Sequence, residues 1–158
     1  MARKDITMTP QEVQQFLSSN TVLEVATIGG DRWPHLAPMW YVMDEGKVVF
    51  RSFTKSQKIV NLARNPKMTV LVETGDNYSQ LQGVMIKGTA QLVTDPAYVL
   101  SVYGGLAAKY PMINDTPVEL DAEALEADFG RFASKNTAVV VEPNKIITWD
   151  HTKLGGTY

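Results

Sequence analysis

The sequence contains no cysteine and only two histidines, His35 and His151. The absence of cysteine excludes disulfide scaffolds, Cys-ligated zinc, iron–sulfur clusters and thiol nucleophiles. A zinc site usually needs about three or four protein ligands, and nothing in the sequence gathers carboxylates around either histidine. We therefore expect no metal centre.

Basic residues are not in excess, with 15 Lys and Arg against 17 Asp and Glu, for a formal net charge of −2. The chain lacks the positive charge that binding to a nucleic-acid backbone requires. No run approaches about 18 apolar residues, and residues 1–8 carry charge without the apolar segment of a signal peptide. These absences predict a cytoplasmic protein that binds neither nucleic acid nor a membrane.

The length of 158 residues suits a single domain over residues 1–158, because domains commonly contain about 100–200 residues. Alternating β-branched runs, separated by turn residues, predict six strands at 22–28, 34–43, 47–53, 68–73, 80–93 and 137–149, the first three as a meander. Capping residues and prolines predict helices at 10–20, 96–109 and 121–132. A further helix is expected to begin at Thr54 or Ser56 and to end at Asn65. The fold class is therefore mainly β, an antiparallel six-stranded barrel with peripheral helices.

Two kinds of residue predict local irregularities in these strands. Pro34 and Pro38 lack the amide hydrogen that a strand donates, which predicts a sheet edge or a bulge. Gly83 and Gly88 mark expected bends in the long strand at 80–93.

Residues 50–58 (FRSFTKSQK) place hydroxyl groups and three cations at the start of a predicted helix. A helix N-terminus carries unpaired amide donors and about half a positive charge, so it suits a phosphate. Six basic residues and no acid lie between Gly46 and Val72, so local ion pairs do not account for the cations. The alternative interpretation is a solvated basic surface whose helix is capped by Thr54 or Ser56.

Aromatic residues gather in two segments, residues 32–41 (RWPHLAPMWY) and 149–153 (WDHTK). The prolines in the first segment leave neighbouring backbone groups free, which suits the edge of a flat heterocycle. The alternatives are a core strand or a dimer interface for the first segment, and a tail docked on a neighbouring surface for the second.

The order of elements and several short motifs resemble the pyridoxamine 5'-phosphate oxidase-like split-barrel flavoproteins. The motifs are Arg32-x-Pro34-His35, Asp44-Glu45-Gly46, Ser56-Gln57-Lys58, Asn61-Leu62, Asn65-Pro66 and the strand from Gly83 to Gly88. The resemblance implies a split barrel that forms a homodimer and binds its cofactor at the subunit interface.

The resemblance also implies which residues bind the cofactor. The flavin ring would lie along the second strand, against Leu36, Ala37, Pro38, Met39 and Trp40. The ribityl chain would contact Arg51 and Ser52 at the end of the third strand. The phosphate would bind at the following helix, to Lys55, Ser56, Gln57 and Lys58. Oxidases of the family often carry arginine where Gln57 stands, and Lys55 would replace that cation. The segment 149–153 resembles actinobacterial members that use the deazaflavin coenzyme F420.

The resulting expectation is a reductase that binds coenzyme F420 and transfers a hydride to an unsaturated organic substrate. The alternatives are an FMN-dependent oxidoreductase of the same fold and a non-enzymatic protein that binds a cofactor or haem. The candidates for proton donation are His35, Tyr41 and His151, and catalytic residues are otherwise unassigned. The cations Arg51, Lys55 and Arg64 are expected to serve the polyanionic tail of the deazaflavin.

Overall fold

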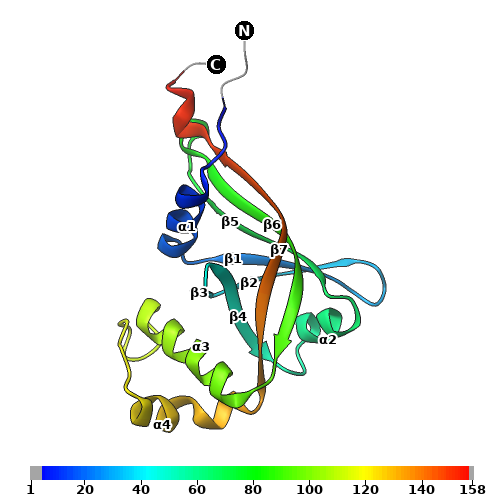
Figure 1. Cartoon of the computed structure of the whole chain (residues 1–158), viewed down its shortest axis with the longest axis vertical. Helices are drawn as coiled ribbons and strands as arrows, with labels where there is room; N and C mark the ends of the chain where they lie inside the picture. The colour runs from blue at the N-terminus through cyan, green and yellow to red at the C-terminus, as the bar shows by residue number, and fades with distance from the viewer. Residues whose placement is uncertain (1–4, 157–158) are drawn as a thin grey trace.

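The computed structural model describes residues 5–156 (Figure 1). Four α-helices and seven strands follow one another in the order α1 (Pro10–Ser19), β1 (Leu23–Ile28), β2 (Pro34–Met39), β3 (Val42–Asp44), β4 (Lys47–Phe53), α2 (Gln57–Arg64), β5 (Lys67–Thr74), β6 (Gln82–Val93), α3 (Pro96–Lys109), α4 (Ala122–Ala133) and β7 (Asn136–Asp150). Two short 3₁₀ helices, η1 (Tyr78–Gln80) and η2 (His151–Leu154), follow β5 and β7.

The predicted starts of α1, α3 and α4 are confirmed by their capping hydrogen bonds. The Thr9 side chain accepts a hydrogen bond from the amide of Glu12, whose carboxylate accepts one from the amide of Thr9. Asp95 and Asp121 cap α3 and α4 through a single bond each, which the aspartate side chain accepts from a backbone amide of the first turn. These contacts satisfy amides that a helix leaves unpaired at its start.

All seven strands form one antiparallel sheet in the order β2-β1-β5-β6-β7-β4-β3, curled into a half-barrel. The inner face packs against α1 and α2, with Leu17, Leu62 and Val70 among its buried residues. A second core lies where α3 and α4 cover β4 and β7, at the lower end in Figure 1. The mainly-β split-barrel class is confirmed, with seven strands in place of the expected six.

The extra strand arises because the predicted strand 34–43 is broken at Trp40 and Tyr41. Its first half, β2, pairs with β1 at one edge of the sheet, and its second half, β3, pairs with β4 at the other. The predicted meander of three adjacent strands is therefore wrong, since β1 and β4 are separated by three other strands.

Side-chain hydrogen bonds stabilise this break. The Tyr41 amide donates to the hydroxyl of Tyr110 (3.1 Å), and that hydroxyl lies 3.0 Å from the Tyr41 carbonyl oxygen and 2.9 Å from that of Thr21. The Tyr41 hydroxyl donates to the carbonyl of Leu17. Because α3 and α1 satisfy the polar groups of Tyr41, the residue is fully buried without a strand partner for its backbone.

The expected irregularities are confirmed at three positions. Pro34 and Pro38 lie on β2, an edge strand, where a missing amide hydrogen is tolerated. The pairing of β6 with β7 shifts register between Lys87 and Gly88. A Cβ at Gly88 would lie 2.8 Å from the Glu142 carbonyl oxygen, so the bulge brings the two backbones too close for a side chain.

The ammonium group of Lys109, at the end of α3, lies above the rings of Tyr41 (3.8 Å) and Tyr110 (5.2 Å). Its nitrogen is buried and has no hydrogen-bond partner among the described residues. Burial lowers the pKa of Lys109 from 10.5 to about 8. The rings attract the cation, but the loss of water outweighs that attraction.

We predict that Lys109 makes stability rise with pH. Because the folded chain releases this proton near pH 8 and an unfolded lysine near pH 10.5, the unfolded state binds more protons between these values. The free energy of unfolding, measured by urea denaturation, should therefore rise between pH 8 and pH 9.5 in the unmodified protein, and rise less in Lys109→Met. An identical pH dependence in both proteins would contradict the assignment.

Candidate functional site

Two free strand edges meet at one cavity in the half-barrel. Among the described residues, β2 pairs only with β1, and residues 50–53 of β4 pair only with β7. The edges contribute Pro38, Met39 and Trp40 from β2 and Arg51 from β4 to a cavity of about 360 Å³, closed by Val22 and Leu106. We call this region the slit. Its unpaired backbone groups can bind the polar edge of a planar ligand.

The predicted ring-binding residues alternate between the two faces of β2. His35, Ala37 and Met39 pair opposite Thr27, Val25 and Leu23, and share the inner face with them. Leu36 lies on the outer face and is 66% exposed. A ligand bound along the slit would therefore meet Ala37 and Met39 from inside the barrel and Pro38 from its rim.

Two of the three indoles remain accessible in the single chain. Trp33 is 74% exposed, and Trp40 is 42% exposed although its ring stacks on Tyr110 at 4.5 Å. Large aromatic side chains that are this exposed beside a cavity are typical of a surface that contacts a ligand or another protein.

Three predicted cofactor-binding residues converge at the N-terminus of α2, two from the expected phosphate site and Ser52 from the expected ribityl site. The Ser52 hydroxyl lies 3.0 Å from that of Ser56 and accepts a hydrogen bond of 3.3 Å from the Lys58 ammonium. Ser56 makes no side-chain capping bond, so its hydroxyl does not satisfy the first amides of the helix. Partial burial lowers the pKa of Lys58. The result is a small group of donors and one cation at the positive end of a helix.

A second cavity of about 440 Å³ lies beside this helix and is lined by Gln57, Asn61, His35, Trp33, Pro34 and residues 29–31. The Gln57 amide donates to the Asn61 side-chain oxygen (2.8 Å), and the Asn61 amide donates to the Thr27 hydroxyl (3.0 Å). Gln57 is therefore held by a neutral network that leads into the sheet.

Local ion pairs do not account for the cations, but contacts with other parts of the fold engage three of the six basic residues in 46–72. Lys47 forms an ion pair with Glu142 at 2.7 Å. The Arg51 guanidinium lies 4.4 Å above the Tyr103 ring and donates to Asn136. Arg64 donates to the Ile28 carbonyl and to Asn61. Lys55 is exposed, which leaves Lys58 as the cation best placed for the helix site.

Two buried nitrogens at these cavities have no hydrogen-bond partner among the described residues, Nε of Arg51 and Nδ1 of His35. An unmet buried donor or acceptor destabilises a protein by about 1–3 kcal/mol unless a ligand or water satisfies it. A planar ligand with polar edge atoms in the slit would supply a partner for Nε of Arg51, so the residues of the slit fit a flavin-type group.

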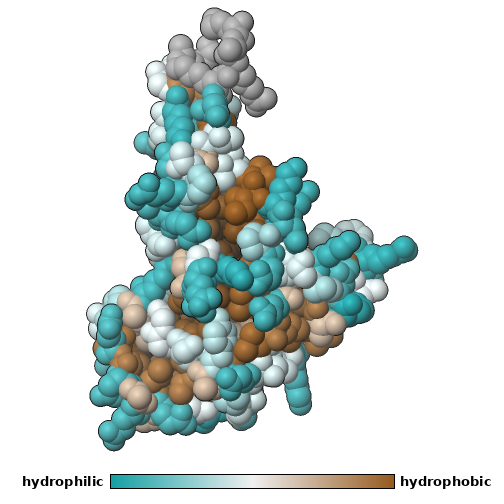
Figure 2. All heavy atoms as spheres, in the orientation of Figure 1, coloured by the Kyte–Doolittle hydropathy of each residue, from teal (hydrophilic) through white to brown (hydrophobic). Residues whose placement is uncertain are grey.

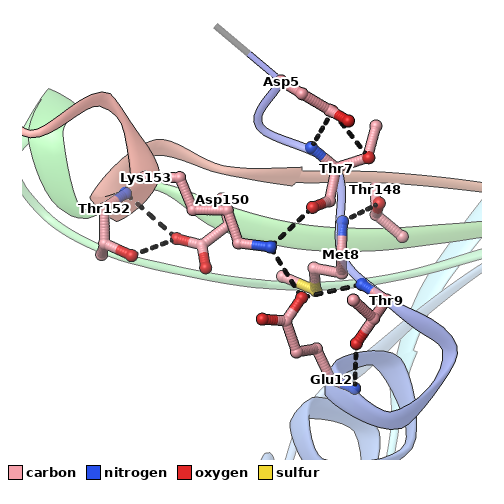
Figure 3. A network of polar contacts seen from close by, with 9 residues as sticks. All are labelled: Asp5, Thr7, Met8, Thr9, Glu12, Thr148, Asp150, Thr152 and Lys153. Atoms are coloured by element: carbon pink, nitrogen blue, oxygen red, sulfur yellow. Dashed lines mark hydrogen bonds and ion pairs between the residues drawn. The ribbon is translucent and has the colours of Figure 1, made fainter.

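The segment 149–153 is docked on its own chain, far from the slit at the opposite end of the β6–β7 ribbon (Figure 1). The Lys153 ammonium donates to the carbonyl of Thr7 and the carboxylate of Glu12, both at 2.7 Å, and Asp150 caps η2 (Figure 3). The ring nitrogen Nδ1 of His151 lies 2.8 Å from the Tyr78 carbonyl oxygen. Within one chain, the docked-tail interpretation describes this segment.

The three candidates for proton donation differ in position. Tyr41 is fully buried and donates its hydroxyl to Leu17, and burial raises its pKa. His151 belongs to the docked tail, whereas His35 lines the second cavity. Only His35 lies beside the predicted binding residues of the same chain.

Two residues that sequence reasoning gave no role organise the site, Tyr110 and Asn61. Asn61 is fully buried on the core face of α2, and an asparagine among the apolar positions of a helix was the available signal. Tyr110 follows α3 directly, and nothing local in the sequence connects it with Tyr41, 69 positions earlier.

Residues 5–156 contain no helix that is long and apolar enough to cross a membrane. The same residues hold no group of three or more His, Asp or Glu side chains that could bind a metal ion.

Comparison with known families identifies the fold's class. Residues 9–149 match the model of the family described as pyridoxamine 5'-phosphate oxidase, and the chain belongs to this family. No curated protein matches the chain.

Solved structures support the same fold. A conserved hypothetical protein from Mycobacterium tuberculosis is 33% identical, with a TM-score of 0.88 over 100% of this chain and 94% of that one. A structure described as an F420 reductase is 22% identical (TM-score 0.60, covering 85% and 94%). An FAD-binding protein from Mesorhizobium loti is 15% identical (TM-score 0.62, covering 90% and 93%).

Proposed function

We propose that the chain is a reductase that binds the deazaflavin coenzyme F420 in the slit and transfers a hydride to an unsaturated organic compound. The observation that carries the proposal is the uncapped N-terminus of α2, with Lys58 and Ser52, next to two unpaired strand edges. This arrangement combines a phosphate site with a flat, partly apolar slit.

The chain's own residues would bind and orient the cofactor. Lys58, Ser52 and Ser56 would hold its phosphate by charge-assisted and hydroxyl hydrogen bonds. The β2 edge from Ala37 to Trp40 would orient the ring, and Nε of Arg51 would donate to it. When bound, the deazaflavin would supply the hydride, since carbon at the flavin's N5 position favours two-electron transfer.

His35 is the residue proposed to donate a proton to the substrate. Its Nδ1 has no partner among the described residues, and its side chain lines the cavity that includes Gln57. Imidazole is the side chain that most often serves as a general acid or base.

The neutral residue Gln57 favours the deazaflavin over FMN. FMN ends in a terminal phosphate dianion, which gains from two adjacent cations, whereas the phosphodiester of a deazaflavin carries a single charge. Gln57 donates to Asn61 in place of presenting a cation, and the described F420 reductase has the same fold. Arg51 donates to Asn136 and Arg64 to the Ile28 carbonyl, so both guanidinium groups are less available to bind the anionic tail of the deazaflavin.

FMN remains the second candidate because the phosphate-binding groups are concentrated at one helix end, as a terminal phosphate requires. The FAD-binding protein among the similar structures shares the fold.

We predict a stable homodimer in which the second subunit completes the slit. Trp33 and Leu36 expose large apolar surfaces beside the cofactor residues. Figure 2 shows further hydrophobic residues on the surface near β7, where Ile146 is 45% exposed. Sedimentation at micromolar concentration should give about twice the chain mass of 17.5 kDa. A monomer that binds cofactor with full affinity would refute a shared site.

We predict that Lys58→Ala weakens cofactor binding about tenfold or more without unfolding the protein. A charge-assisted hydrogen bond contributes about 1.5–3 kcal/mol, and about 1.4 kcal/mol corresponds to a factor of ten. Titration followed by fluorescence measures the affinity, and circular dichroism checks the fold. The control is Lys47→Ala, because Lys47 forms an ion pair with Glu142 that is partly exposed to solvent. Equal losses in both variants would indicate a diffuse field and no phosphate site.

We predict that the apoprotein binds coenzyme F420 more tightly than FMN and reduces activated alkenes or quinone-like compounds with the reduced deazaflavin. Native mass spectrometry and absorbance spectra with F420, FMN and haem measure which ligand binds, and a substrate panel measures turnover. If FMN binds at least about ten times more tightly or copurifies stoichiometrically, the FMN alternative replaces the proposal. Haem binding alone would favour the non-enzymatic alternative.

A further inference from the structure

A second group of cations lies on the outer face of the sheet. Lys87 of β6 pairs directly opposite Lys145 of β7 and opposite Thr69 of β5. Lys67 pairs opposite Thr89, two residues further along the same strands. Directly paired residues point to the same face of a sheet, so the three lysines share one surface. The core residue Met68 points to the other face.

Lys67 and Lys87 line a cavity of about 670 Å³ on this surface, with Asn144, Thr69 and Thr89 among the other lining residues. The Thr89 hydroxyl donates to the Asn144 side-chain oxygen. We call this cavity the lysine groove. The two ammonium groups, the Asn144 amide and the Thr69 hydroxyl can donate hydrogen bonds to an anion.

No carboxylate lines the lysine groove. Within residues 5–156, the ion pairs closer than 4 Å join Lys47 to Glu142 and Lys153 to Glu12, and neither involves these three lysines. Glu142 pairs opposite Thr89 but is engaged by Lys47. The positive charge of the groove is therefore not neutralised by the chain itself.

The lysine pair is unfavourable for the sheet without an anion. Like charges directly opposite each other on neighbouring strands repel, by an amount comparable to the stabilisation that an opposite-charge pair provides. The bulge between Lys87 and Gly88 adjoins this pair. Bulges redirect side chains and are enriched beside binding sites.

We infer that the lysine groove binds a small polyanion, a compound that carries a phosphate group or several carboxylates. Such a ligand would lie between Lys67, Lys87 and Lys145 and would neutralise the Lys87–Lys145 pair. A small anion fits better than a polymer because the chain is negative overall and the charge is confined to one groove. The site lies on the face of the sheet opposite the core and does not depend on the proposed cofactor.

The test is calorimetric titration of the full-length protein with pyrophosphate and, separately, with citrate, which distinguishes phosphate from carboxylate ligands. Each titration is made in the Lys58→Ala background, so that binding at the α2 helix does not contribute. We expect binding that weakens about tenfold or more in Lys87→Gln/Lys145→Gln, since each charge-assisted hydrogen bond contributes substantially to affinity. Backbone amide shifts around Lys67 and Lys87 would locate the site.

The matched control is Lys135→Gln, which removes an exposed lysine at the end of α4, outside the groove. It should leave the affinity unchanged.

Thermal denaturation provides a second readout. Lys145→Gln should raise the midpoint temperature of unfolding of the ligand-free protein and abolish most of the stabilisation that the anion gives. Equal affinity in the double variant and the control, or a midpoint that falls in Lys145→Gln, would overturn the proposal, as would the absence of binding to both probes.

Discussion

The half-barrel depends on the hydrogen bonds that Tyr110 makes with the backbone of Tyr41. A strand that continued through Tyr41 would keep residues 34–44 together beside β1. Because Tyr110 satisfies the amide and approaches the carbonyl of Tyr41, the chain leaves one edge of the sheet and enters the other. The same step creates two free edges, one on β2 and one on the second half of β4, and these edges border the slit. The candidate site thus follows from the broken strand.

Sequence reasoning recovered the features that have local causes. The capping box at Thr9, the prolines on an edge strand and the bulge at Gly88 each depend on residues close together in the chain. The broken strand was missed because its cause lies 69 residues away, in the hydroxyl of Tyr110. Trp40, Tyr41 and Val42 are of residue types enriched in strands, so only a tertiary contact reveals that the strand is broken there.

The partners of the basic residues in 46–72 could not be predicted from the sequence either. The segment contains six cations and no acid, but an antiparallel sheet places residues from distant strands beside them. Lys47 meets Glu142, and Arg51 meets Asn136, across the β4–β7 region. The phosphate interpretation consequently depends on Lys58, whose side chain, within residues 5–156, makes one hydrogen bond, to Ser52, and no ion pair. A local excess of basic residues therefore indicates a binding site only where those residues have no partner elsewhere in the fold.

The cavity beside α2 and the lysine groove share the end of the β1–β2 hairpin. Pro34 lines the groove as well as the cavity beside α2, and Ile28, whose carbonyl accepts from Arg64, also lines the groove. The two residues pair opposite each other at the end of the hairpin. Because this end of the hairpin borders both cavities, a substitution at Pro34 would alter the lining of both, whereas Lys87 lines the groove and Gln57 lines the cavity beside α2.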